Sequence, residues 1–340
     1  MRCSLRLTWA ALAAGLVAVA LPRSVSSQDV TVSGVGYAQY RYQLSDTAAN
    51  NNGFAVTRAY INVNGNLGGG LVTRITPDLF STTEGSFALR LKYAYAAYTP
   101  PSFPLTFKLG IIHTPWLDWA EGIWVYRMQG TMSVERNGYI TSADLGFGVD
   151  GAWGHQRVNM QVGVYNGEGY HGGVGDANKD VMGRVSVRLL STDVQGSRGG
   201  LRLTGYGHYG KPTGGGVRAR AIGMLSYQSS RLTVGAEGAL TRDSSSATPS
   251  PLLEGSVLSG FGIYKIPGTM AALVARVDLA DPDRDTANDR QTRFIGGVSY
   301  RIHPNLQLLA NIDHVDYQGT PTPAQQALRT QALFQVEFTY

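Results

Sequence analysis

The sequence predicts an all-β fold, a transmembrane antiparallel β-barrel of about sixteen strands. Three observations lead to this prediction: an N-terminal secretion segment, strands that alternate apolar and polar residues, and connections that alternate between short and long. A mean hydropathy of -0.11 does not argue against a membrane protein, because a barrel exposes only alternate residues to lipid. The 43 glycines and 18 tyrosines suit tight turns and a membrane-water interface.

Residues 1–27 have the three parts of a secretory signal peptide that is cleaved on export. Arg2 and Arg6 precede an apolar run over 7–21, and small residues at 25–27 form a cleavage site. Pro22 ends the run too early for an uncleaved membrane anchor. Cleavage removes Cys3, the only cysteine, and leaves residues 28–340 as a single barrel domain without an intramolecular disulfide.

Strict alternation divides the barrel domain into sixteen expected strands and no helical domain. An alternating strand places apolar side chains on one face and polar side chains on the other, which suits lipid outside and water inside. The strands are expected at 30–43, 53–66, 71–80, 86–99, 104–112, 143–153, 157–166, 181–190, 200–209, 217–228, 231–241, 254–265, 270–280, 291–302, 305–316 and 328–340.

The last expected strand ends the chain on an aromatic residue, Tyr340. Apolar residues fill every second position from Ala332 onward, and polar residues lie between them. This segment resembles the closing strand of Gram-negative outer-membrane barrels. The resemblance implies an outer-membrane location in a Gram-negative-type bacterium, contact with outer-membrane lipid, and recognition of the strand by the barrel-assembly machinery.

The connections between the strands fall into two classes that alternate along the chain. Short connections are expected at 100–103, 154–156, 229–230, 266–269 and 303–304, with a somewhat longer one at 191–199. Longer polar segments are expected at 44–52, 113–142, 167–179, 242–253, 281–290 and 317–327, and the segment 81–85 is short for this class. Short periplasmic turns and longer external loops produce this pattern, whereas a soluble β-sandwich has no reason to alternate.

Sorting charges by strand face predicts a basic lumen. Sixteen basic residues fall on the expected inner faces, against seven acidic residues. These arginines either pair with wall carboxylates or create a field that attracts anions, and the excess favours the field. The candidate lumen-lining, anion-binding residues are Arg58, Arg74, Arg90, Lys92, Lys108, Arg184, Arg188, Arg202, Arg218, Arg220 and Arg293.

Five short motifs between residues 54 and 146 resemble a known family. Segments 54–60, 93–98, 107–116, 135–136 and 143–146 look like the Phe-x-x-Arg-Arg, Gly-x-x-x-x-Pro, Glu-Arg and Asp-x-Gly landmarks of the phosphate-selective porin O and P family. At the first landmark this chain has Thr57-Arg58 where the family often has two arginines. Members are sixteen-stranded trimeric barrels, so the resemblance implies a homotrimer.

The longest connection, 113–142, resembles the third external loop that folds into the lumen of porins and narrows it. A long loop rich in aromatic residues needs a surface to pack against, which the barrel wall supplies. A trimer contact or a surface lid is the alternative. The candidate residues of this constriction loop are Trp116, Asp118, Trp119, Glu121, Trp124, Tyr126, Arg127, Glu135 and Arg136.

Catalysis, metal and cofactor binding, and nucleic-acid binding find little support in the sequence. Asp313 and His314 point to opposite faces by alternation, and the other histidines lack metal-ligand spacing. There is no run of Lys and Arg despite a calculated pI of 9.2. We therefore expect no enzyme, no cofactor and no nucleic-acid partner.

Taken with the resemblance, these patterns imply a passive, water-filled porin that admits small hydrophilic solutes and prefers small anions, with phosphate as one candidate. One alternative is a porin for neutral sugars, in which Trp116, Trp119, Trp124 and Tyr206 offer stacking surfaces. The other is a structural or adhesive barrel with a plugged lumen.

Overall fold

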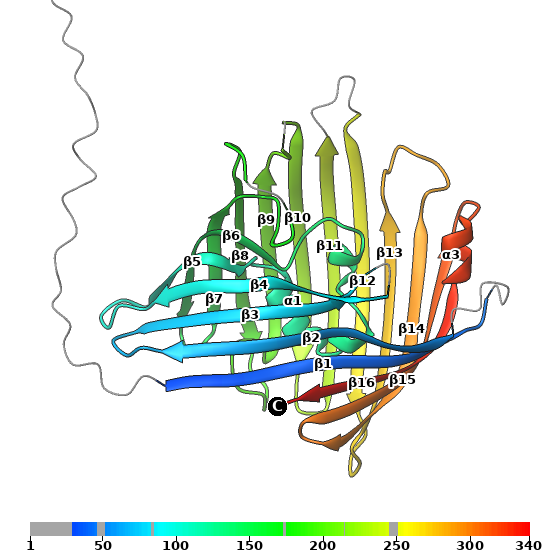
Figure 1. Ribbon diagram of the computed structural model, residues 1–340, viewed down its shortest axis with the longest axis horizontal. Coiled ribbons are helices and arrows are strands. Elements are labelled where there is room, and N and C mark those ends of the chain that lie inside the picture. The colour runs from blue at the N-terminus through cyan, green and yellow to red at the C-terminus, as the bar shows by residue number, and fades with distance from the viewer. Residues whose placement is uncertain (1–28, 46–51, 83–84, 173–174, 214, 245–250) are drawn as a thin grey trace, which may run out of the picture.

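The computed structural model describes residues 29–45, 52–82, 85–172, 175–213, 215–244 and 251–340. Its strands form one closed barrel in which every neighbour pair is antiparallel and sequence neighbours lie side by side (Figure 1). The prediction of a sixteen-stranded antiparallel barrel is confirmed. The expected signal peptide, 1–27, lies outside the described residues.

The sixteen strands agree with the alternation pattern to within a few residues at each end. They are β1 Asp29–Gln43, β2 Gly53–Asn66, β3 Leu71–Ser81, β4 Phe87–Tyr98, β5 Leu105–His113, β6 Ala143–Trp153, β7 Val158–Tyr165, β8 Asp180–Leu190, β9 Gly200–Gly210, β10 Val217–Gln228, β11 Leu232–Ser244, β12 Leu253–Lys265, β13 Ala271–Asp281, β14 Gln291–His303, β15 Leu306–Tyr317 and β16 Thr330–Thr339. β11 runs three residues past its expected end, because its ladder with β12 continues to the pair Asp243 and Leu253.

Side chains on each strand alternate between the lumen and the outer surface. On β9, Arg202 and Tyr206 are buried inside, whereas Leu203 is 55% exposed on the outside. The same parity leaves apolar residues on the outer surface of the other strands, as a lipid-facing barrel requires. One end of the barrel carries the short connections, such as 266–270 and 304–305, and is called the short-turn end. The opposite end is the long-loop end.

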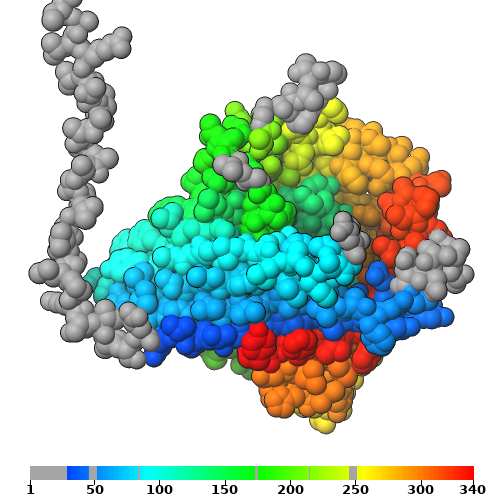
Figure 2. Space-filling view, in the orientation of Figure 1, coloured from blue at the N-terminus to red at the C-terminus, as the bar shows by residue number. Residues whose placement is uncertain are grey.

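The barrel closes where β1 pairs with β16, with Ala38 opposite Val336. Figure 2 shows this joint on one face, where the blue first strand lies against the red last strand. Gly36 leaves room at this joint for the Phe338 ring, because a Cβ atom there would lie 2.2 Å from it. Gly34 leaves the same room for Tyr340.

Helices occur only in connections, within the part of the chain that the structure describes. The connection between β5 and β6 contains α1 Leu117–Trp124, the 3-10 turn η1 Arg127–Gln129 and α2 Ser133–Arg136. α3, Pro323–Ala327, precedes β16. Among the described residues, none of these helices has the length and apolarity needed to span a bilayer. The sequence patterns did not predict them.

Candidate functional site

The connection from β5 to β6, residues 114–142, is the segment predicted to form the constriction loop, and its contacts place it inside the barrel. Trp116 Nε1 donates a hydrogen bond of 2.9 Å to Glu237 on the inner face of β11. The Tyr126 hydroxyl lies 2.6 Å from that of Ser299 on β14, and Gln335 on β16 donates to the Met128 carbonyl over 2.7 Å. Because these partners lie on β11 to β16, across the barrel from β5 and β6, the loop crosses the lumen (Figure 1).

One face of the loop forms an apolar core with the wall. Trp116, Ile123 and Trp124 are fully buried. The Trp124 ring packs edge to face against Phe261 of β12 with centroids 5.3 Å apart, and Trp116 lies 5.7 Å from Tyr206 of β9. Neither tryptophan therefore presents a free ring face, which argues against the alternative in which they form stacking surfaces for neutral sugars.

The other face of the loop is charged. Arg127 lies 2.7 Å from a carboxylate oxygen of Glu121 and 3.8 Å from one of Glu135. Burial raises the pKa of Glu135 above its ordinary value, although Arg127 opposes the change. Asp118, at the start of α1, is half exposed. This face thus carries three carboxylates against one guanidinium.

Opposite the charged face stand two cations of the wall, Arg74 on β3 and Lys92 on β4. Arg74 donates hydrogen bonds to Asn62 over 2.7 Å and to Thr76 over 2.9 Å. The Lys92 ammonium lies 3.3 Å from the Tyr60 hydroxyl and 4.5 Å from its ring centre. Within the described residues, neither cation has a carboxylate at ion-pair distance.

A cavity of about 160 Å³ separates this wall from the loop. Arg74 and Lys92 line one side of it, and Asp118, Glu121 and Arg127 line the other. Its remaining lining comes from Val35, Tyr37, Tyr60, Asn62, Thr76, Tyr93 and His113. The cavity therefore has a basic side, an acidic side and tyrosine rings between them.

The other candidate cations of β2 to β5 and β14 are paired. Arg58 and Arg90 share the buried carboxylate of Asp78, the second over 2.9 Å. Lys108 pairs with Asp150 on β6. Arg293 pairs with Asp313 at 2.8 Å. These contacts follow the wall-pairing alternative, and of the predicted anion-binding residues on these strands, Arg74 and Lys92 have no carboxylate partner among the described residues.

Arg184 and Arg202 fasten the loop instead of lining open space. Arg184 is 4% exposed, and its guanidinium lies 4.1 Å from the Trp119 ring centre. Arg202 is fully buried and lies 5.6 Å from the same ring. Arg198, from the connection 191–199, donates to the Trp119 carbonyl and pairs with Asp118 at 3.1 Å. Three guanidiniums thus surround one indole, which removes Arg184 and Arg202 from the predicted anion surface.

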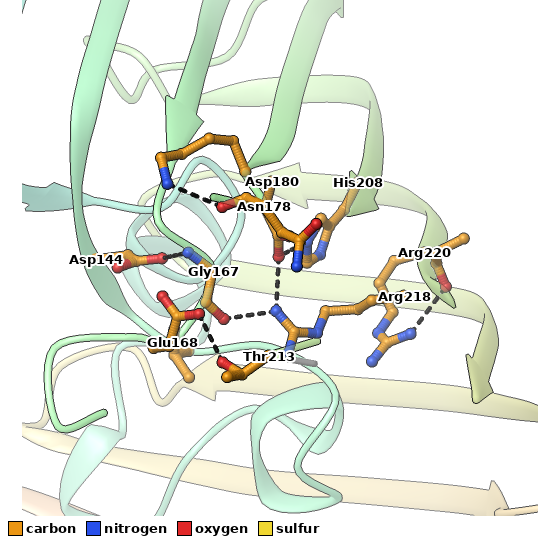
Figure 3. A network of polar contacts seen from close by, with 12 residues as sticks. Asp144, Gly167, Glu168, Asn178, Asp180, His208, Thr213, Arg218 and Arg220 are labelled. Carbon is orange, nitrogen blue, oxygen red and sulfur yellow. Dashed lines mark hydrogen bonds and ion pairs between the residues drawn. The ribbon is translucent and has the colours of Figure 1, made fainter. Parts of the chain in front are cut away.

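Arg218 and Arg220 are also engaged, near the long-loop end. Figure 3 shows Arg218 between Asp180, 2.8 Å away, and the Gly167 carbonyl. Asp180 also binds the His208 ring nitrogen at 2.7 Å. Arg220 donates to the Tyr139 carbonyl of the constriction loop and to Asp243, both at 2.8 Å. Arg218 and Arg220 therefore belong to two separate hydrogen-bonding networks.

The remaining candidates take structural positions. Arg188 donates to the His155 carbonyl over 2.7 Å at the short-turn end. Burial lowers the pKa of Arg136 to about 9, which leaves it charged at neutral pH beside Asp278. No group of three or more His, Asp or Glu side chains in the described ranges could hold a metal ion.

The sequence patterns missed two residues of the site. Arg198 lies in a turn, where strand alternation assigns no face. Alternation along its strand places Glu237 on the lumen face, but nothing in its neighbourhood in sequence indicates that it binds Trp116.

No protein-family model matches the sequence, and no curated protein is significantly similar to it. The resemblance to the phosphate-selective porin O and P family is therefore not confirmed. Solved structures do match. The anion-selective porin from Comamonas acidovorans has a TM-score of 0.69 and 13% identity, covering 92% of this chain and 100% of that one. OmpF of Salmonella typhi, solved with daunomycin, has a TM-score of 0.66 and 10% identity over 92% of this chain and 98% of that one.

The outer-membrane channel DcaP of Acinetobacter baumannii has a TM-score of 0.62 and 13% identity, covering 92% of this chain and 97% of that one. All three similarities extend over nearly the whole barrel at low identity. They show that the chain has the fold of outer-membrane porins.

Proposed function

We propose that this protein is a passive diffusion channel of the outer membrane of a Gram-negative-type bacterium, and that it prefers small anionic solutes. The observation that carries the proposal is the pair Arg74 and Lys92, two wall cations without carboxylate partners among the described residues, which face the constriction loop across a cavity.

The charges around this cavity favour anions by a small margin. The wall contributes Arg74 and Lys92 to its lining, and the loop contributes Asp118, Glu121 and Arg127. The three cations of the lining outnumber its two carboxylates. Low-dielectric walls focus such an excess into a potential that a passing ion experiences. The similarity in fold to a porin described as anion-selective agrees with a preference for anions.

The proposal also includes partners and solutes that the sequence patterns indicate. We propose a homotrimer, assembly through the C-terminal strand that ends at Tyr340, and contact with outer-membrane lipid along the apolar outer surface. Phosphate stays one candidate among small anionic solutes. No catalysis is assigned to the protein.

Reversal potentials across a salt gradient test the proposal. In planar bilayers the native protein should prefer anions, and Arg74→Gln/Lys92→Gln should lose most of that preference. The change should be largest in dilute salt, because the Debye length falls from ~10 Å at 0.1 M to ~3 Å at 1 M.

Arg218→Gln/Arg220→Gln is the matched control, since these arginines are held by Asp180 and Asp243. We expect its selectivity to stay close to the native value. A cation-preferring native channel, or an Arg74/Lys92 variant with native selectivity, would contradict the proposal. A plugged structural barrel would show no conductance steps at all.

A further inference from the structure

A second hollow, of about 240 Å³, lies at the short-turn end between β12 and β15. It is separate from the cavity that contains Arg74 and Lys92, and it is formed by different strands. Its lining consists of Tyr126, Lys265, Thr269, Met270, Ala271, Ala272, Ser299, Arg301 and Gln307. Tyr126 belongs to the constriction loop, so the hollow adjoins the loop on its short-turn side.

The lining contains two cations and no carboxylate. Lys265 is exposed and forms no ion pair with any residue that the structure describes. Arg301 donates to the Gln307 side-chain oxygen over 2.8 Å and to the Pro304 carbonyl over 3.3 Å. Glu337 is opposite Gln307 on the neighbouring strand, yet it forms no ion pair with Arg301. The lining therefore carries two positive charges, and the nearby Glu337 carboxylate offsets that of Arg301 only in part.

Its other side is apolar, and its size suits an organic molecule. Met270, Ala271 and Ala272 provide hydrocarbon contacts, and the Tyr126 and Ser299 hydroxyls bind each other at 2.6 Å. A water molecule occupies ~30 Å³ in the liquid, so the hollow has room for ~8 waters. That space is larger than a hydrated halide needs, and apolar walls give no advantage to an inorganic anion.

We propose that this hollow is a binding site for small organic carboxylates. The carboxylate contacts Lys265 and Arg301, and the hydrocarbon part lies against Met270 and Ala272. Charge-assisted hydrogen bonds to a guanidinium and an ammonium favour a carboxylate over a neutral group of the same shape. The inference rests on the proposed channel function, because the ligand reaches the hollow through the lumen.

Binding can be measured without conduction. Benzoate, a carboxylate on a ring whose proton signals are easily resolved, serves as the probe in saturation-transfer NMR with the full barrel in phosphatidylcholine nanodiscs. Signal from empty nanodiscs is subtracted. Benzyl alcohol, which has the ring without the charge, should give a much weaker signal. In Lys265→Gln/Arg301→Gln the dissociation constant for benzoate should rise by roughly tenfold.

Arg231→Gln is the matched control, because Arg231 is exposed at the same end of the barrel but does not line the hollow. The dissociation constant of this variant for benzoate should equal that of the native protein. Equal loss of binding in both variants would mean that a general basic rim attracts benzoate, which overturns the site. Equal signals from benzoate and benzyl alcohol would also overturn it. If benzoate does not bind but the channel prefers anions, the channel proposal stands. If the channel shows no anion preference but benzoate binds with native affinity, the binding-site proposal stands.

Discussion

Two buried tryptophans of the constriction loop differ in what their ring nitrogens contact. Trp116 Nε1 donates to Glu237, whereas Trp124 Nε1 has no partner among the described residues. Both rings are fully buried. The pair therefore separates the contribution of a buried hydrogen bond from that of ring packing.

We expect Trp116→Phe to lower the free energy of unfolding by about 1–3 kcal/mol more than Trp124→Phe does. Each variant loses a similar ring area, but only the first leaves the buried Glu237 carboxyl without its donor. Denaturant titration of the detergent-solubilised barrel measures the difference. Equal losses would show that the Trp116–Glu237 bond contributes nothing to loop attachment.

Selectivity should depend on pH through Glu135. Burial raises the pKa of this carboxyl, so it gains a proton at a higher pH than an exposed glutamate would. Protonation removes one negative charge from the loop face. Anion preference should therefore increase as pH falls from 7 to 5, as measured by reversal potentials, and Glu135→Gln should reduce the increase. A Glu135→Gln channel with the full native pH response would exclude this carboxyl as its origin.

At single residues, alternation predicted the direction of a side chain but not its partner. It placed Arg202 on the inner face, where the structure has it, yet it could not show that Trp119 covers Arg202. That contact depends on the path of a loop from another part of the chain. The same limit applies to Arg58, which meets Asp78 only because β2 and β3 have a particular register.

Whole strands could be predicted because the alternation that defines each strand lies within its own residues. Alternation with a period of two is imposed by the pleat and by lipid on one side, so each strand carries its own signal. Bulges were not predictable. Register shifts occur at Tyr37/Ala38 and at Thr76/Pro77, and they change which residues meet on β1 to β4. The lining of the cavity beside Arg74 depends on them.

Among the helices, α3 has a start signal in the sequence that a search for alternating strands does not detect. Thr322 accepts a hydrogen bond from the Gln325 amide, and the Gln325 side chain binds back to the Thr322 amide. This capping box, with Pro323 in the first turn, is a helix-start pattern that can be read from sequence. α1 and α2 lack any side-chain cap and form through packing inside the barrel.

A pair of substitutions on β2 tests the assignment of its two faces. Ile61 is 44% exposed on the outside, and Asn64 has the opposite parity. Replacing Ile61, near the bilayer midplane, with arginine should lower the free energy of unfolding by ~2–4 kcal/mol. Replacing Asn64 with arginine should lower it much less, because water reaches the lumen. Refolding titrations into lipid vesicles measure both. A similar loss of stability at both positions would contradict the assignment of one face to lipid and the other to the lumen.

Across the whole molecule, the loop divides the barrel interior into two unlike regions. On the side of β8 to β13, Trp119, Trp124 and the guanidinium groups around them pack against the wall, and a hollow of about 300 Å³ lined by Asp180, Arg218 and Arg220 lies nearer the long-loop end. On the side of β1 to β4, a polar cavity remains. We propose that anions pass along the wall that carries Arg74 and Lys92, because these cations have no carboxylate partner among the described residues, whereas Arg218 and Arg220 are paired with Asp180 and Asp243.

The pairing of β1 with β16 also sets the timing of folding. The strands that close the barrel, β1 and β16, are the first and last of its sixteen strands, so their hydrogen bonds join residues far apart in the sequence. Until the two strands pair, each has an open edge whose backbone groups lipid cannot satisfy. We therefore expect the closure of β1 on β16 to be the last step of folding in the membrane.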